Sequence, residues 1–158
     1  MKSLAGVLAL AIVISQSHAK NDKQTPVTKC PEGVLPDLVY VGNVGDEPCT
    51  ESPCPINPSK AIELKMNFTA PYLMEDPYMQ VYVSLIHMDY PFINHDACSM
   101  ITNTVCPPVA NEDIEFHFQM SLPSRLPSVS VDLQFYLQPD QKSNTKAVCF
   151  GITVMIVN

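Results

Sequence analysis

Six cysteines are the residues whose type and spacing first suggest chemistry in this chain. Two pairs are close in sequence, and the other two cysteines lie near the two ends of the chain: Cys30, Cys49, Cys54, Cys98, Cys106 and Cys149. An even number of cysteines in a secreted chain is typical of disulfides rather than of thiol nucleophiles. Six cysteines allow fifteen pairings, and spacing alone does not choose among them. The simplest arrangement has two local disulfides and one that joins the ends.

Histidines and carboxylates give little support for catalysis or metal binding. Glu112 and Asp113 are neighbours at an expected strand start, so their side chains point to opposite faces and make a poor acid–base pair. No Gly-x-Ser-x-Gly turn, phosphate loop or HExxH helix is present. One loop region does combine groups that can bind metals, but their spacing fits no zinc pattern: His87, Asp89, His95 and Asp96. We therefore expect no enzyme activity, no metal and no cofactor.

The start of the chain has the pattern of a secretory leader. Met1 and Lys2 precede an apolar run over residues 4–14, and Ser17-His18-Ala19 supplies small residues for a cleavage site. The run is too short to span a membrane, which takes about 20 apolar residues. The sequence predicts a signal peptide over residues 1–19 and one secreted domain over residues 20–158, in an oxidising compartment that permits disulfides.

The charge balance limits the classes of partner. Sixteen acidic residues against nine basic ones give a formal net charge of −7. This acidic balance argues against nucleic acid and against an anionic membrane as direct partners. We expect a monomer with an acidic surface.

Strict alternation of apolar and polar residues dominates the rest of the chain. Strands with one polar and one apolar face, separated by proline-rich loops, are typical of two antiparallel sheets packed face to face. We therefore predict an all-β sandwich. The expected strands cover residues 38–41, 61–69, 79–85, 114–120, 129–137 and 148–157, the last of these more continuously apolar than the others.

One alternating segment places a glycosylation sequon on its outward face. Asn67-Phe68-Thr69 matches the acceptor pattern, and Asn67 falls on the polar side of the strand over residues 61–69. The inward faces of the strands are rich in methionine and phenylalanine. Methionine adapts to irregular partners, but from composition alone a close-packed core is the better interpretation than a cavity.

The cysteines and their neighbours together resemble the Niemann–Pick type C2 proteins of the ML (MD-2-related lipid-recognition) family. The resemblance covers nearly all of residues 20–158. Its motifs are Lys29-Cys30, the Cys49–Cys54-Pro55 box, the sequon at Asn67, Tyr90-Pro91 ahead of Cys98, Cys106-Pro107, Leu122-Pro123, Leu126-Pro127-Ser128 and Cys149.

The resemblance implies a fold, a function and a disulfide pairing. The fold would be an immunoglobulin-like antiparallel sandwich with a lipid cavity between its sheets. The pairing would be Cys30–Cys149, Cys49–Cys54 and Cys98–Cys106. The function would be that of a carrier, secreted or in the lysosomal lumen, that transfers a sterol or long-chain fatty acid without chemical change and hands it to a membrane or receptor. The alternative is an extracellular module that recognises a semiochemical or microbial lipid together with a receptor protein.

Family likeness and inward alternation together suggest which residues contact the ligand. Tyr90 falls at the expected mouth, and Ser124 and Leu126 depart from the family pattern there. Arg125, the single arginine, adjoins the mouth and is a candidate to bind a carboxylate. The expected ligand-binding residues are Leu64, Met66, Phe68, Val81, Val83, Leu85, Tyr90, Phe116, Phe118, Leu122, Pro123, Leu126, Pro127, Val131, Leu133, Phe135, Phe150 and Ile152.

Overall fold

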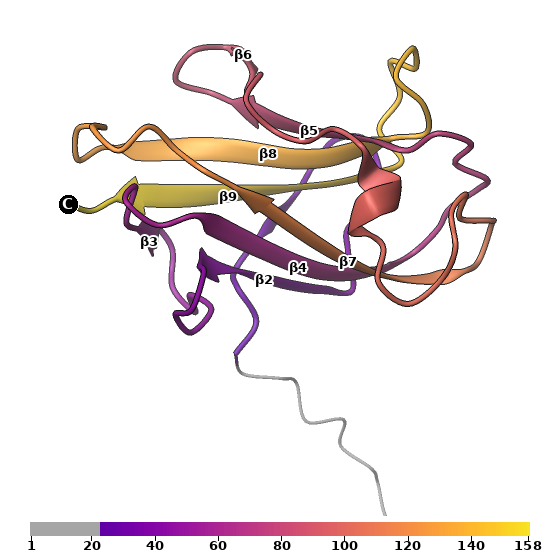
Figure 1. Cartoon of the computed structure of the whole chain (residues 1–158), viewed down its shortest axis with the longest axis horizontal. Helices are drawn as coiled ribbons and strands as arrows, with labels where there is room; N and C mark the ends of the chain where they lie inside the picture. The colour runs from indigo at the N-terminus through magenta and orange to yellow at the C-terminus, as the bar shows by residue number, and fades with distance from the viewer. Residues whose placement is uncertain (1–22) are drawn as a thin grey trace, which may run out of the picture.

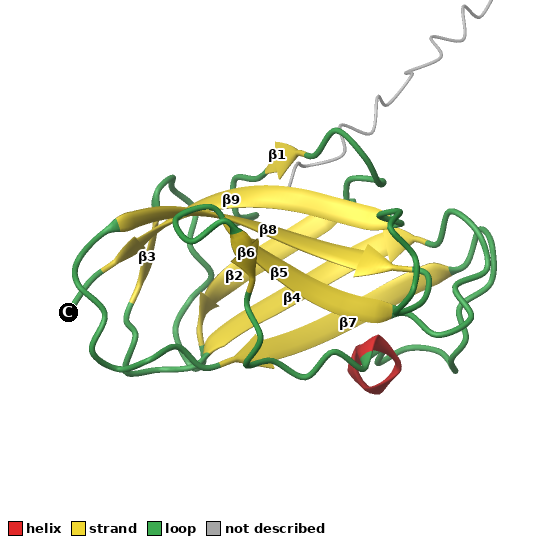
Figure 2. Cartoon of the chain, turned by 90° about the horizontal axis from the view of Figure 1, so that it is seen from above, coloured by secondary structure: helices red, strands yellow, loops and turns green. Residues whose placement is uncertain are grey.

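Residues 23–158, the part of the chain that the computed structural model describes, form a sandwich of two β-sheets (Figure 1). The predicted signal peptide over residues 1–19 lies outside the described residues. Seen from above, the strands of the two layers run at an angle to each other (Figure 2). The all-β sandwich that the alternation predicts is confirmed, as is the immunoglobulin-like form that the family likeness implies.

Each sheet gathers strands that are distant in the sequence. The small sheet has the order β2 (Leu38–Asn43), β4 (Ile62–Thr69) and β7 (Asp113–Met120). A single turn of 3₁₀ helix, η1 (Ala97–Met100), lies beside β7. The large sheet has the order β1 (Thr28–Lys29), β9 (Val148–Ile156), β8 (Ser130–Gln138), β5 (Tyr78–Val83) and β6 (Met88–Asp89), and β3 (Cys54–Ile56) also pairs with β9.

The long strands form where the alternation predicts them, and the differences have local causes. Strand β5 ends at Val83, so Leu85 lies in the turn that follows and is 60% exposed. Strand β3 pairs with β9 in parallel, with Cys54 opposite Val154, whereas only antiparallel sheets were predicted. Strands β1, β3 and β6 are each two or three residues long, which is too short to show a period of two.

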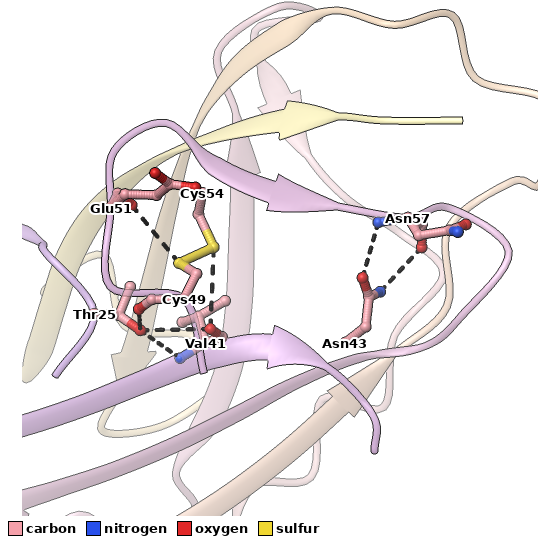
Figure 3. The surroundings of a disulfide bond; sticks show 7 residues. All are labelled: Thr25, Val41, Asn43, Cys49, Glu51, Cys54 and Asn57. Carbon is pink, nitrogen blue, oxygen red and sulfur yellow. Dashed lines mark hydrogen bonds between the residues drawn. A yellow bond between two sulfur atoms is a disulfide. The ribbon is translucent and has the colours of Figure 1, made fainter. Parts of the chain in front are cut away.

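The join between β2 and β3 is held by side chains that bond to the main chain (Figure 3). The Thr25 hydroxyl accepts from the Val41 amide at 2.9 Å and donates to the Cys49 carbonyl at 2.8 Å. The Asn43 side chain makes two bonds with the main chain of Asn57, at 3.0 and 2.8 Å. These buried polar groups are therefore satisfied and fix the edge where β3 meets β9.

Three disulfides tie the described chain together in the pairing that the family likeness implies. Cys30–Cys149 joins residues 119 apart in sequence, and Cys49–Cys54 and Cys98–Cys106 close local loops. None of the described cysteines is free. The pairing also equals the simplest arrangement that the spacing allows.

Candidate functional site

A hollow of about 280 Å³ lies between the two sheets, at the end where the β7–β8 loop connects them. The C-terminus lies at the same end (Figure 1), where the Asn158 side chain donates to the Leu126 carbonyl at 3.2 Å. The fifteen residues that line the hollow are Val81, Val83, Leu85, Ile86, Tyr90, Met120, Leu122, Pro123, Leu126, Pro127, Val129, Val131, Leu133, Val154 and Ile156. All of these side chains are apolar except for the Tyr90 hydroxyl.

The register of the strand pairing explains why the residues that line the hollow lie together. In the large sheet, Val83 is opposite Leu133, and Val131 is opposite Val154. Alternation points all four toward the other sheet. Met120, the last residue of β7, faces them from the small sheet. The hollow is therefore a product of the strand pairing and not of one loop.

Phenylalanine side chains close the inner end of the hollow. Phe135 packs edge to face with Phe118 across the two sheets, with 6.3 Å between ring centroids. Phe135 also stacks on Phe150 at 5.3 Å, and both rings are 1% exposed or less. Phe118 is two residues from Met120 on β7, and Phe135 is two residues from Leu133 on β8, so these rings fill the space between the layers next to the hollow.

Two short segments form the mouth of the hollow. The β7–β8 loop contributes Leu122 and Leu126, and the turn after β5 contributes Leu85 and Ile86. Tyr90 spans the gap between them, because its hydroxyl donates to the main-chain carbonyl of Ser121 at 3.2 Å. Burial raises the pKa of Tyr90 above its ordinary value, so the phenol keeps its proton at physiological pH.

Ten of the eighteen residues expected to bind ligand line this hollow, and eight do not. The ten come from β5, β8 and the two mouth segments, together with Tyr90. The structure places the other eight in the closed core, where they pack against neighbouring side chains instead of facing free space: Leu64, Met66, Phe68, Phe116, Phe118, Phe135, Phe150 and Ile152.

Sequence reasoning left out five lining residues: Ile86, Met120, Val129, Val154 and Ile156. Met120 and Val154 fall on inward faces by alternation, so their direction was predicted although their place in the hollow was not. Ile86 carried no such signal, because it lies in the turn beyond the end of β5.

An exposed apolar surface adjoins the mouth, and we call it the mouth patch. It consists of Leu85, Ile86, Met88 and Phe92, which are 60%, 52%, 50% and 77% exposed. Phe92 packs edge to face on Tyr90 with 5.6 Å between ring centroids, so the patch is continuous with the hollow. Exposed apolar groups gathered in this way mark contact surfaces more often than scattered single residues do.

Three other hollows, of about 320, 370 and 300 Å³, lie on the outer surface of the described chain. Charged residues line each of them, including Asp46, Glu51 and Glu115. An apolar ligand would gain little there, because its surface would stay beside water and charge. The hollow between the sheets is therefore the better candidate site.

The histidines and acids of the loop after β5 take separate structural roles. His95 donates from Nδ1 to the Met79 carbonyl at 2.7 Å and stacks on Tyr78. Asp89 accepts from the Tyr136 hydroxyl at 2.8 Å, and Asp96 caps η1. Across residues 23–158, no three His, Cys, Asp or Glu side chains gather where they could hold a metal ion.

A polar cluster lies on the outer face of the small sheet, the face that points away from the hollow. His117 Nε2 lies 2.7 Å from Glu63 Oε1, and Lys65 Nζ lies 3.1 Å from Glu63 Oε2. Burial opposes ionisation of Glu63, but hydrogen bonds with Lys65 and His117 outweigh it and lower the pKa of Glu63. His117 thus faces outward, and its side chain is partly buried beside Glu63.

Glu112 closes its loop instead of pairing with Asp113. It accepts from the Thr104 hydroxyl at 2.5 Å and from the Val109 amide at 2.9 Å, and these bonds lower the pKa of Glu112. The Asp113 side chain accepts a hydrogen bond from the Thr69 hydroxyl.

Asn67, the asparagine of the predicted glycosylation sequon, lies on the outer face of β4 and is partly exposed, as its place in the alternation predicts. Glycosylation of Asn67 stays a prediction.

Comparison with known proteins identifies the family. Residues 24–156 match the ML domain family, so the chain belongs to this family of lipid-binding proteins. The structure is similar to that of a Niemann–Pick type C2 protein from the Japanese carpenter ant, with a TM-score of 0.69 and 17% sequence identity. The match covers 84% of this chain and 99% of the ant protein. At this identity the likeness concerns the fold.

No curated protein sequence is significantly similar to this chain. Among residues 23–158, no helix has the length and apolar character needed to cross a membrane.

Proposed function

We propose that this protein is a carrier that holds one apolar lipid in the hollow between its sheets and releases it chemically unchanged. The observation that supports this most directly is an apolar hollow that is closed at its inner end and open at its mouth. Sterols and long-chain fatty acids, the ligands implied by the family likeness, are the first classes to test. Secretion is the route that the predicted leader favours, and the lysosomal lumen is the alternative.

The volume of the hollow limits the binding free energy that an apolar ligand can gain there. If a methylene takes about the space of a water molecule, roughly 30 Å³, then 280 Å³ holds about nine such groups. At about 0.8 kcal/mol for each buried methylene, the gross gain is roughly 7 kcal/mol. Immobilising the ligand offsets part of this gain. Affinities of about 10 μM or weaker follow for ligands that fit without expanding the hollow.

Binding and release need no catalytic group. The lining offers neither a nucleophile nor an acid–base pair, since Tyr90 is its only polar side chain. An apolar ligand gains by leaving water, and release requires an acceptor that is equally apolar. The arrangement therefore suits transfer without reaction.

The mouth patch favours a second candidate function, recognition of a lipid together with a receptor protein. Leu85, Ile86, Met88 and Phe92 would be covered by such a partner, and the ligand would lie at the interface. The same surface would also serve a carrier that hands its ligand to a membrane or to a receptor.

Native mass spectrometry of the protein purified from culture medium tests the proposal, followed by extraction and identification of the co-purified lipid. We expect one apolar molecule per chain, and a mass addition at Asn67 if the sequon is used. A protein that is empty, and stays empty when offered cholesterol, palmitate and decanoate, whose chain is close to the capacity of the hollow, would contradict the carrier function.

A further inference from the structure

The turn over residues 84–87, which joins β5 to β6 at the mouth, is held only loosely by its own residues. Leu85 and Ile86 line the hollow from this turn, yet they are 60% and 52% exposed, so packing fixes them little. Two main-chain hydrogen bonds within the turn are both 3.3 Å long. The β5 end of the turn is tied to β8, because the Ser84 amide donates to the Asp132 carbonyl at 3.0 Å. The β6 end needs a contact of its own.

Strand β6 is a weak support for that end by itself. It has only two residues, and it lies at the edge of the large sheet, where it pairs with β5 (Figure 1). On its outer side, His87 Nδ1 lies 3.5 Å from the Tyr82 hydroxyl, which is at the limit of hydrogen-bond length and exposed to water. Neither contact is strong enough to fix the turn.

One short side-chain hydrogen bond ties β6 to the middle of the large sheet. The Tyr136 hydroxyl donates to Asp89 Oδ1 at 2.8 Å. Tyr136 belongs to β8 and Asp89 to β6, and the sheet order places β5 between them. Tyr136 follows the inward-facing Phe135, so its side chain lies on the outer face of the sheet. The bond therefore crosses a whole strand on the face opposite the hollow.

Tyr136 is well placed to act as an anchor. Its side chain is buried and packs against the Cys30–Cys149 disulfide. Lys146 Nζ lies 4.4 Å from the centroid of its ring, a cation–π contact. Burial, and then the bond to Asp89, raise the pKa of Tyr136, so the phenol keeps its hydrogen at physiological pH and stays a donor.

We infer that Tyr136 and Asp89 are positioning residues for the hollow: their hydrogen bond across β5 holds the β5–β6 turn where Leu85 and Ile86 form one side of the mouth. This inference rests on the proposed carrier function, because it makes the affinity for an apolar ligand depend on a bond on the opposite face of the sheet. Neither Tyr136 nor Asp89 lines the hollow, so their effect on binding passes through the turn.

The size of the expected effect follows from the contacts that the turn supplies. Without the bond, β6 keeps its short pairing with β5, and the turn spends part of the time away from the mouth. A ligand then loses contact with Leu85 and Ile86 during that time. Lost contact equal to one or two buried methylenes corresponds to about fourfold to fifteenfold weaker binding.

Methyl-resolved NMR of the free protein and titration with 1-decanol test the inference together. The ten carbons of this probe nearly match the capacity of the hollow, about nine methylene-sized groups. In Tyr136→Phe and in Asp89→Ala, we expect the Leu85 and Ile86 methyl signals to shift and 1-decanol to bind about fourfold to fifteenfold more weakly. The double variant should be no worse than either single variant, because both remove the same bond.

Two further variants serve as controls. Tyr82→Phe removes another phenol oxygen from the outer face of the same hairpin, and it should change neither the methyl signals nor the affinity. Asp89→Asn keeps an oxygen acceptor, so it should stay closer to wild type than Asp89→Ala does. Loss of stability alone moves neither readout, since both are measured on the folded protein. Tyr136→Phe and Asp89→Asn change little volume, so the test stands even if Asp89→Ala folds poorly.

Leu85 and Ile86 signals that stay in place in Tyr136→Phe would overturn the inference, as would equal weakening of 1-decanol in Tyr82→Phe. Unchanged affinity in variants whose Leu85 and Ile86 signals do shift would also overturn it and leave the carrier function in place. If wild type binds none of 1-decanol, decanoate, palmitate and cholesterol, both the inference and the carrier function are contradicted.

Discussion

The two halves of the space between the sheets are built on the same strands, yet one half is filled and the other is hollow. In the filled half, Phe135 contacts Phe150 and Phe118, with ring centroids 5.3 and 6.3 Å apart. In the hollow half, β8 and β9 carry Val131 and Val154 at the corresponding inward positions. These shorter side chains leave about 280 Å³ unfilled.

The comparison shows that side-chain size along an inward face, and not the backbone, positions the site. Strand β8 passes through both halves without a break, from Ser130 to Gln138. A change from phenylalanine to valine or leucine along this strand turns a packed core into a cavity. Emptying the filled half should therefore cost much stability, whereas filling the hollow half should cost little stability and abolish binding.

Removing disulfides gives the largest expected effects. Cys30 and Cys149 cluster with Tyr136 on the outer face of the large sheet, whereas Cys54 lies opposite Val154, which lines the hollow. Replacing Cys30 and Cys149 by alanine should cost roughly 5 kcal/mol of unfolding free energy, because this disulfide spans 119 residues. Replacing Cys49 and Cys54, five residues apart, should cost roughly 2 kcal/mol.

Urea unfolding of the two disulfide variants measures this difference. Equal losses would contradict the assignment of the long disulfide as the principal constraint on the chain. Loss of ligand binding in the Cys49/Cys54 variant alone would show that β3 also shapes the hollow.

Truncating one side chain in each half tests the comparison directly. Phe135→Ala should destabilise the protein by about 3–5 kcal/mol, since the ring is 1% exposed and packed on two others. Leu133→Ala, two residues away and facing the hollow, should cost only about 2 kcal/mol, because fewer contacts are lost. Thermal unfolding measures both. A larger loss for Leu133→Ala would mean that the hollow is packed in solution.

Enlarging one side chain in each half should again cost more stability in the filled half, but should abolish binding only in the hollow half. Val148→Phe adds a ring to filled space and should cost about 1–3 kcal/mol. Val131→Phe places the ring in the hollow, so it should cost less than about 1 kcal/mol and abolish ligand binding. Unfolding and titration of both variants distinguish the two sites. Retained binding in a folded Val131→Phe protein would place the ligand elsewhere.

Replacing Arg125 by alanine should give the smallest effect of these variants, and it tests whether a positive charge at the mouth helps to bind a carboxylate. Arg125 is exposed between Leu122 and Leu126 in the β7–β8 loop. An exposed ion pair contributes about 0.2–1 kcal/mol, so Arg125→Ala should weaken decanoate by about twofold and leave 1-decanol and sterols unchanged. Lys142→Ala, in the loop between β8 and β9, is the matched control. Equal weakening of acid and alcohol would contradict a role of Arg125 in binding the carboxylate.

Much of the fold could be predicted from the sequence because period-two alternation is a direct consequence of a half-buried strand. The segments over residues 61–69 and 129–137 match β4 and β8 to within one residue. The parallel pairing of β3 could not be predicted. Strand β3 has only three residues, too few for alternation to show, and its partner β9 is about 100 residues further along the chain.

The site could be predicted only in part, because alternation gives the direction of a side chain and not the space in front of it. Phe135 and Leu133 both point inward, yet one is packed against rings and the other faces the hollow. That difference depends on which residue of the other sheet lies opposite. The mouth patch was also absent from the prediction, since Leu85 was assigned to a strand that ends at Val83.

Methyl-resolved NMR with 1-decanol tests most directly whether the hollow half holds the ligand. The account predicts that the methyl signals of Val131, Leu133 and Val154 shift on titration, and that those of Leu137 and Val148 in the filled half do not. Shifts confined to the filled half, or to the outer surface, would contradict it.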